Sequence, residues 1–252
     1  MILKVSNLSK SFPIENMEPQ QVLKNIDLTI DNGEFVSIMG ASGSGKSTLL
    51  YTISGMTQPT SGTVEFAGEN LSNLSEEELT NLRLGKIGFV FQQANLLKNF
   101  SLIDNVTLSA YLGKKESKLK IDQRAKQLMK QAGVSEIATK DITQASGGQL
   151  QRVSICRALI NQPEIIFGDE PTGALNSNSA ADIMKLFNEV NQTGKTILLV
   201  THDAKIASQT ERILYMSDGE IIAERYLGKM TDSSQLKERE EKVAEWLKVL
   251  EF

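Results

Sequence analysis

Alternating hydrophobic and polar positions predict strands at both ends of the chain. Residues 2–8 and 22–30 alternate in the manner of half-buried strands. Residues 34–39 form a shorter, mostly apolar run that ends at a glycine. Residues 165–167 and 196–200 are apolar on both faces, as central parallel strands tend to be. Helical patterns separate these runs, so the pattern predicts an α/β fold.

Three further segments have recognisable patterns. Residues 212–216 and 220–225 flank Asp218-Gly219, a dipeptide typical of a hairpin turn. Residues 75–78 have the spacing of a capping box and predict the start of a surface helix. Residues 102–158 lack strong strand runs and predict a helical subdomain inserted between the sheet segments.

The end of the chain predicts an amphipathic helix over residues 235–252. Val243, Trp246, Leu247 and Leu250 follow the i, i+3, i+4, i+7 spacing of one helix face. We expect this face to pack against the protein's own surface; a partner-binding role is the alternative.

Composition narrows the class of protein. The 252 residues carry 27 Lys and Arg against 31 Asp and Glu, and this mildly acidic balance argues against a general nucleic-acid binder. The single cysteine, Cys156, excludes an intrachain disulfide and fits a reducing compartment. We expect no signal peptide and no direct membrane insertion, because no run reaches the roughly 18 apolar residues that a span requires. A membrane role would therefore require a partner.

A glycine-rich segment predicts a nucleotide site. It matches G-x-x-x-x-G-K-[ST] between the strand at residues 34–39 and an apolar helix over 48–53. In such a loop the backbone N–H groups face phosphate oxygens, the lysine neutralises the β- and γ-phosphates and the next hydroxyl coordinates Mg²⁺. The predicted ATP ligands are Gly40, Ser42, Gly43, Gly45, Lys46, Ser47 and Thr48.

Two adjacent carboxylates, Asp169 and Glu170, follow the predicted strand at residues 165–167. The carboxyl ends of strands are where open α/β sheets bind ligands. Neighbouring strand residues point to opposite sides, so the two acids can have different roles. We expect Asp169 to hold Mg²⁺ and Glu170 to polarise the water that attacks the γ-phosphate.

The segment Ser146-Gly147-Gly148-Gln149, followed by Gln151-Arg152, identifies a family. With the preceding motifs in this order, the sequence resembles the ATP-binding cassette (ABC) family. The resemblance implies a P-loop NTPase (RecA-like) core with an antiparallel β-subdomain and an inserted α-helical subdomain. The ATPase domain would span residues 1–228, with the helical subdomain at about 93–158 and a helical extension at 229–252.

The resemblance also implies an ATP site shared by two chains. Two cassettes stack head to tail on ATP binding, and the signature segment, Ser146 to Gln149, supplies donors to the γ-phosphate held by the other copy. Gln92 resembles the glutamine that touches Mg²⁺ and the attacking water, and His202 resembles the switch histidine at the γ-phosphate. Phe12 resembles the aromatic residue that stacks on adenine.

Two positions depart from the family pattern. Ala145 stands where leucine or isoleucine is usual, which trims a packing contact. Asn176 replaces the aspartate of the loop that crosses the dimer interface, which keeps the shape and loses the charge. Both changes are expected to weaken coupling between the two ATP sites, and neither argues against ATP binding.

The sequence further resembles the branch that serves lipoprotein release, macrolide export and antimicrobial-peptide resistance. Its tail is most similar to the bacitracin and lantibiotic resistance type. This implies a homodimer with a separate integral membrane permease, placed in the cytoplasm at the inner face of the membrane.

The rival is a soluble ABC ATPase in translation or DNA repair, for which a second cassette or coiled-coil insertions are expected. The signature segment argues against a P-loop kinase or GTPase. Lys46, Glu170 and His202 argue against a degenerate, non-hydrolysing cassette.

Overall fold

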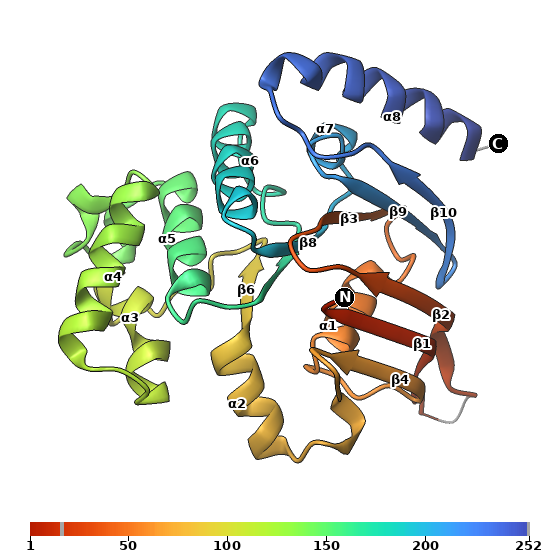
Figure 1. The fold of residues 1–252 in the computed structure, drawn as a ribbon, viewed down its shortest axis with the longest axis horizontal. Helices are drawn as coiled ribbons and strands as arrows, with labels where there is room; N and C mark the ends of the chain where they lie inside the picture. Colours follow the sequence, from red (N-terminus) through yellow and green to blue (C-terminus); the bar gives the residue numbers. More distant parts are fainter. Residues whose placement is uncertain (16–17, 251–252) are drawn as a thin grey trace. The chain divides into compact units, whose positions relative to one another are not determined.

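The computed structural model describes residues 1–15 and 18–250, which fall into two compact units. Unit 1 contains Met1–Ser75 and Thr196–Phe252, and unit 2 contains Glu76–Lys195. The element labels are those of Figure 1. Each unit is described separately.

Unit 1 contains an antiparallel sheet in the order β2-β1-β4-β5. The alternating burial of β1 places Leu3, Val5 and Leu8 in the core. Register shifts after Val5 bend this strand where it pairs with β2. The strands are β1 (Leu3–Phe12), β2 (Gln20–Ile30), β4 (Ser61–Phe66) and β5 (Glu69–Asn70), and the 3-10 turn η1 (Leu71–Asn73) follows.

A second set of strands in unit 1 runs in the order β10-β9-β3-β8. The central strand β3 lies parallel to β8 and β9, and all its residues are buried, as its apolar sequence predicts. The hairpin β9–β10 forms around Asp218-Gly219 as predicted. The strands are β3 (Phe35–Gly40), β8 (Thr196–Val200), β9 (Arg212–Ser217) and β10 (Glu220–Tyr226). The helices are α1 (Lys46–Ile53), α7 (Ala204–Ala207) and α8 (Leu236–Leu250), with the 3-10 turn η4 (Ser233–Gln235).

Unit 2 combines a parallel strand pair with helices. Strand β6 (Ile87–Phe91) lies parallel to β7 (Ile165–Asp169), with Phe89 stacked on Phe167 at 5.7 Å between ring centroids. The helices are α2 (Glu76–Lys86), α3 (Leu102–Gly113), α4 (Lys118–Gln131), α5 (Gly147–Leu159) and α6 (Ser177–Gln192), with the short 3-10 turns η2 (Ser135–Ile137) and η3 (Ile142–Gln144).

The hydrophobic pattern predicted most of these elements. The α/β fold class is confirmed, and helices α3, α4 and α5 occupy the segment predicted to be helical. The pattern gave no prediction of β4, β5 or β6 as strands. The predicted C-terminal helix forms and ends at Leu250; Glu251 and Phe252 lie outside the described residues. The division at residue 228 and the subdomain limits stay predictions.

Candidate nucleotide-binding and catalytic site

The glycine-rich loop connects β3 to α1 in the predicted strand–loop–helix order. Gly40, Gly43 and Gly45 have positive φ angles of 148°, 83° and 101°, where a side chain is disfavoured. A Cβ atom on Gly40 would also lie 2.1 Å from the carbonyl oxygen of Met216. Close contact with β9 and the backbone conformation therefore both require glycine here.

Lys46 begins helix α1 and is 7% exposed. Its Nζ donates a 2.7 Å hydrogen bond to the carbonyl of Ala41, so the ammonium group lies within the loop. Ser47 and Thr48 follow in the first turn of α1. A helix start that carries an inward lysine is an anion-binding arrangement, because the free N–H groups and the ammonium charge act together.

The turn of the β9–β10 hairpin supports this loop from outside it. Gly219 N–H donates to the carbonyl of Ser44 at 3.1 Å, and Lys24 N–H of β2 donates to the carbonyl of Gly219 at 2.9 Å. Gly219 has φ +84°, and a Cβ there would lie 2.3 Å from the carbonyl oxygen of Val22. Sequence reasoning identified this turn as a hairpin and missed its contact with the phosphate loop, which joins residues 175 positions apart.

Phe12 ends strand β1 and is 40% exposed, so it is not part of the core. Lys10 Nζ lies 4.9 Å from the centroid of the Phe12 ring and donates a 2.7 Å hydrogen bond to the carbonyl of Gln58. An exposed ring backed by a cation presents a flat apolar surface, which suits stacking against a base.

His202, the chain's one histidine, lies two residues after the end of β8 and is exposed, so it is not a buried structural imidazole. The next residue, Asp203, caps α7 by accepting a 2.8 Å hydrogen bond from Lys205 N–H. Asp203 N–H donates to Thr201 Oγ1 at 3.0 Å. These bonds fix the backbone on both sides of the imidazole.

In unit 2, the two predicted carboxylates lie at the carboxyl end of β7. Asp169 is the last residue of the strand, and Glu170 begins the following turn with φ +46°, a conformation uncommon for a residue other than glycine. Gly173 N–H donates to the Glu170 carbonyl at 3.0 Å and closes this turn.

Gln92 follows β6, which pairs with β7 so that Phe91 is opposite Asp169. The side chains of Gln92 and Glu170 meet beside Gly173. A Cβ added to Gly173 would lie 2.9 Å from Gln92 Nε2 and 3.2 Å from Glu170 Oε2. Residues far apart in the sequence are thus brought near one another, and any larger residue at Gly173 would press on both.

The predicted signature segment forms the start of helix α5. Ser146 is the N-cap, and its Oγ accepts from Gln149 N–H at 3.3 Å. Gln149 Oε1 in turn accepts from Ser146 N–H at 2.9 Å, completing a capping box. Gln149 therefore has a structural role at this helix start. Ser146 and Gly147 are exposed, so the N-terminal donors of α5 face outward.

Helix α5 also holds the segment around Gln92. Gln151, 2% exposed, donates a 2.8 Å hydrogen bond from Nε2 to the carbonyl of Phe91. Arg157 donates to the carbonyls of Ala94 and Asn95 at 2.8 and 2.7 Å, and burial lowers the pKa of its guanidinium. Sequence reasoning did not assign Gln151 or Arg157 a functional role, because their partners are about 60 positions away.

Asn176 caps helix α6 by accepting a 2.9 Å hydrogen bond from Ser179 N–H, so the amide keeps the capping geometry expected of an aspartate. Ala145 is half-buried and is the C-cap of the short turn η3. The structure thus accommodates both departures without distorting either helix start.

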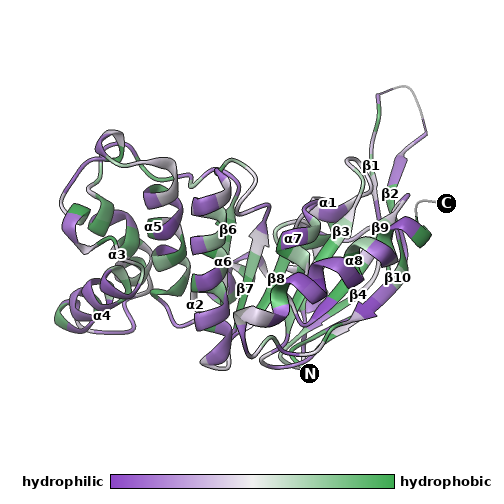
Figure 2. Ribbon diagram, turned by 90° about the horizontal axis from the view of Figure 1, so that it is seen from above, coloured by the Kyte–Doolittle hydropathy of each residue, from purple (hydrophilic) through white to green (hydrophobic). Residues whose placement is uncertain are grey.

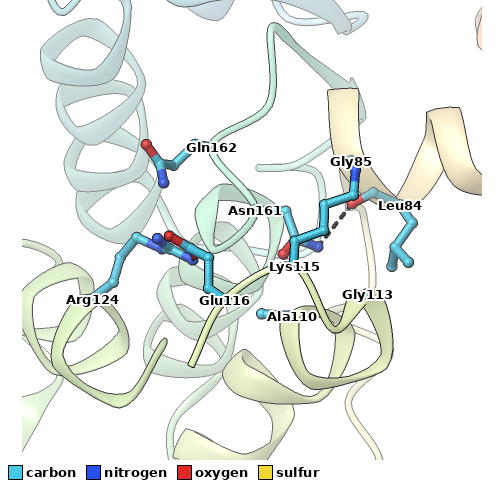
Figure 3. A pocket seen from close by; sticks show the side chains of 9 residues that line it. All are labelled: Leu84, Gly85, Ala110, Gly113, Lys115, Glu116, Arg124, Asn161 and Gln162. Atoms are coloured by element: carbon cyan, nitrogen blue, oxygen red, sulfur yellow. Dashed lines mark hydrogen bonds and ion pairs between the residues drawn. The ribbon is translucent and has the colours of Figure 1, made fainter. Parts of the chain in front are cut away.

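A hollow of about 210 Å³ in unit 2 is separate from these residues (Figure 3). Figure 3 shows Asn161 bonded to the Leu84 carbonyl on one side of it, at 2.8 Å, and Arg124 beside Glu116 on the other. None of the predicted site residues lines it, so it is not the nucleotide site. The lining residues are Leu84, Gly85, Ala110, Gly113, Lys115, Glu116, Arg124, Asn161 and Gln162.

The described residues contain no group of three or more His, Cys, Asp and Glu side chains that would hold a metal ion by themselves. Among the same residues, no helix is long and apolar enough to cross a membrane.

Comparisons with known proteins identify the class. The family model described as ABC transporter matches residues 23–173. The chain is 41% identical over 228 residues to the bacitracin export ATP-binding protein BceA of Halalkalibacterium halodurans, covering 90% of this chain and 89% of the relative. It is 40% identical to the lipoprotein-releasing system protein LolD 1 of Chlorobium chlorochromatii, covering 90% and 92%.

A third relative is longer. The macrolide export ATP-binding/permease protein MacB of Acinetobacter baylyi is 43% identical over 225 residues, which span 89% of this chain and 33% of that protein. Among solved structures, a dimeric post-hydrolysis state of the ATP-binding cassette MJ0796, bound to ADP and Pi, superposes with a TM-score of 0.84 at 42% identity, covering 91% of this chain and 100% of that one.

The chain therefore belongs to the ABC transporter family. Within that family it is an ATP-binding, ATP-hydrolysing cassette.

Proposed function

We propose that the chain is the ATPase subunit of an ABC exporter, that two copies dimerise on binding ATP, and that the dimer drives a separate membrane permease. Coverage of about 90% of both BceA and LolD 1 supports a subunit of the stand-alone type. MacB, of which the chain matches 33%, carries ATP-binding and permease functions in one protein. The cassette would lie in the cytoplasm at the inner membrane face, held by the permease.

In the proposed reaction, unit 1 binds the nucleotide. Phe12 stacks on adenine, and Lys46 neutralises charge on the β- and γ-phosphates. His202, exposed after β8, contacts the γ-phosphate. The loop residues Gly40, Ser42, Gly43, Gly45, Ser47 and Thr48 contribute backbone and hydroxyl donors.

Unit 2 supplies the groups that act on water. Glu170 is the general base, because hydrolysis needs a carboxylate in line with the γ-phosphate to orient and deprotonate the attacking water. Gln92, whose amide lies beside Glu170 at Gly173, orients the same water. Their proximity is the single observation that best supports a hydrolysing cassette over an inactive one.

The start of α5 acts on the partner's nucleotide. Ser146 and the amides of Gly147 and Gly148 present outward donors at a helix N-terminus, which favours negative charge. Because the capping box of Ser146 and Gln149 fixes the start of α5, these donors can stabilise the developing charge with little reorganisation during the reaction. The site is complete only when a second copy provides them.

Magnesium fits the residues assigned to it. Mg²⁺ prefers oxygen ligands and is usually held by one or two carboxylates plus substrate phosphates, and Asp169 at the carboxyl end of β7 is a carboxylate of this kind. Ser47, Asp169 and Gln92 would hold it. When bound, the ion neutralises charge on the transferring phosphoryl group.

For the transported molecule, we propose an antimicrobial peptide. Similarity to the bacitracin export protein over 228 residues supports this choice. Similarity to the lipoprotein-releasing protein is nearly equal at 40%, so lipoprotein release is the second candidate. The soluble-ABC alternative gains no support from these relatives.

Purification from native membranes tests the partner. Tagged Glu170→Gln protein is recovered from detergent-solubilised membranes of its own cells with ATP and Mg²⁺, beside a Lys46→Ala control that should bind ATP about tenfold or more weakly. Co-recovery of a polytopic membrane protein with Glu170→Gln, but less with the control, supports the exporter. Recovery of ribosomes or nucleic-acid proteins instead would contradict it.

Growth tests separate the two substrates. A strain that lacks this chain should become sensitive to bacitracin or lantibiotics and be rescued by the wild type but not by Glu170→Gln. Normal peptide resistance together with lipoproteins retained in the inner membrane would reject the peptide and favour lipoprotein release.

A further inference from the structure

Helix α8 packs against α7 and against residues of β3 and β9 in unit 1 (Figure 1). Figure 2 shows hydrophobic and hydrophilic residues mixed along this helix, and its buried residues are Arg239 and Val243. Val243 is fully buried in a cluster with Met39, Ala207 and Ile213. The partly buried side chains Ala204, Tyr215, Leu227, Trp246 and Leu247 pack around this cluster. The tail helix thus packs against the protein's own surface, as expected from its sequence.

Two members of that cluster adjoin the nucleotide motifs. Met39 immediately precedes Gly40, the first glycine of the phosphate loop. Ala207 ends α7, the short helix that begins two residues after His202. Helix α8 therefore contacts a residue that adjoins the phosphate loop and the short helix that follows the histidine.

Arg239 of α8 adds a specific polar contact. It is 6% exposed, and its guanidinium donates to the carbonyls of Ser208, Thr210 and Leu227 at 2.7, 2.7 and 3.1 Å. Burial lowers the pKa of Arg239, and the nearby Glu211 carboxylate acts in the opposite direction. A buried guanidinium that satisfies three backbone carbonyls is costly to replace, since each carbonyl would lose its donor.

Arg239 contacts the end of α7, and His202 lies immediately before the N-cap of the same helix. Ser208 is the C-cap of α7, and Asp203 is its N-cap. Because α7 contains only four residues, the Ser208 N–H donates to the carbonyl of Ala204 in its first turn at 2.9 Å, so a bond that holds Ser208 also restrains that turn. Asp203, held by Thr201 and by Lys205 N–H, then sets the backbone of His202.

We propose that Arg239 is a positioning residue for His202, acting through α7, and that α8 is therefore part of the catalytic support of this cassette. This rests on the proposed role of His202 at the γ-phosphate. Loss of the Arg239 contacts would leave ATP binding by the phosphate loop and Phe12 nearly intact and would misplace the imidazole. Small misplacements of a positioned group lower the rate of the chemical step.

The single histidine allows a direct test. In protein labelled with ¹³C and ¹⁵N on histidine, one imidazole signal reports His202 without assignment. Arg239→Ala should shift or broaden this signal, and Arg239→Lys, which keeps the charge and cannot make all three bonds, should shift it less. The exposed neighbour Lys237→Ala should leave it unchanged. An unchanged signal in folded Arg239→Ala and Arg239→Lys proteins would overturn the proposal.

Kinetics then test the consequence. Arg239→Ala should lower kcat on the order of tenfold, with KM for ATP changed less than about twofold. In a His202→Ala background, Arg239→Ala should give no further loss, because the residue it positions is gone. An equal loss in both backgrounds would show general destabilisation and reject the proposal. Failure of His202→Ala alone to lower kcat would instead reject the role assigned to the histidine.

Discussion

Gln151 Nε2 donates a 2.8 Å hydrogen bond to the carbonyl oxygen of Phe91, the residue immediately before Gln92. Gln151 lies in the first two turns of α5, the helix that also begins with the signature serine. The bond therefore links the signature helix to the segment that carries Gln92. A displacement of α5 would be transmitted to the glutamine beside Glu170.

We predict that Gln151→Leu lowers the free energy of unfolding by about 1–2 kcal/mol, because a carbonyl loses its buried donor. It should also lower the ATPase kcat by about tenfold through the misplaced Gln92, with little change in KM for ATP. Denaturant unfolding and steady-state kinetics measure the two effects. Gln127→Leu, an exposed glutamine of α4, is the control. Wild-type kcat in Gln151→Leu would show that the bond does not position Gln92.

Asn176 tests whether the missing charge matters for the fold. Asn176→Ala should destabilise the protein by about 1 kcal/mol, because α6 loses the acceptor for Ser179 N–H. Asn176→Asp should keep the cap and change stability by no more than about 0.5 kcal/mol, since a carboxylate at a helix start is favourable. Thermal unfolding of both variants checks this. If Asp were as costly as Ala, the side chain would not act as the cap described.

Arg212 joins β9 to β10 and to Glu34, the residue that precedes β3. It bonds Glu224 of β10 with two nitrogens at 2.8 and 3.0 Å and Glu34 at 3.2 Å. The Glu34 side chain is 10% exposed, so removing Arg212 leaves a nearly buried carboxylate without its cationic partner, with only the hydrogen bond from Asp31 N–H at 2.9 Å. We predict that Arg212→Ala lowers the free energy of unfolding by about 3 kcal/mol. Arg225→Ala on the exposed side of β10 should cost much less, and equal losses would contradict the account.

Cys156 gives a prediction about pH. The thiol is 1% exposed, and burial raises its pKa from 9.0 to about 12. Above pH 9 the unfolded chain loses this proton and the folded chain keeps it, so stability should fall as pH rises from 9 towards 12. Below pH 9 the thiol should contribute no pH dependence.

Thiol labelling measures whether the Cys156 thiol is buried in the folded protein. At pH 8 an aromatic disulfide reagent should modify Cys156 only as the protein unfolds, and the pH dependence above 9 should weaken in Cys156→Ala. Rapid labelling of the native protein would contradict the buried position.

The sequence predicted the elements whose pattern is local. Strands β3 and β8 are continuous apolar runs, and the β9–β10 turn has its own dipeptide signal. Strand β4 was not predicted because only Val64 and Phe66 are buried in a short run of small and polar residues. Its neighbour β1, about 60 positions earlier, stabilises it as a strand.

The candidate site shows the same division. Lys46 and Ser146 carry motif signals that depend on adjacent residues. Gln151, Gly219 and Arg239 carry none, because each acts through a backbone carbonyl distant in sequence. The roles that depend on tertiary contacts therefore required the fold.

The mass of Glu170→Gln protein in solution tests the central claim most directly. With ATP and Mg²⁺, light scattering should give twice the 27.7 kDa of one chain, because hydrolysis stalls while ATP holds the two copies together. Adding Ser146→Arg to the same protein should restore the single-chain mass, since the donors in trans are blocked. A Glu170→Gln protein that remains a single chain, or that hydrolyses ATP at the wild-type rate, would contradict a site completed by two copies with Glu170 as its base.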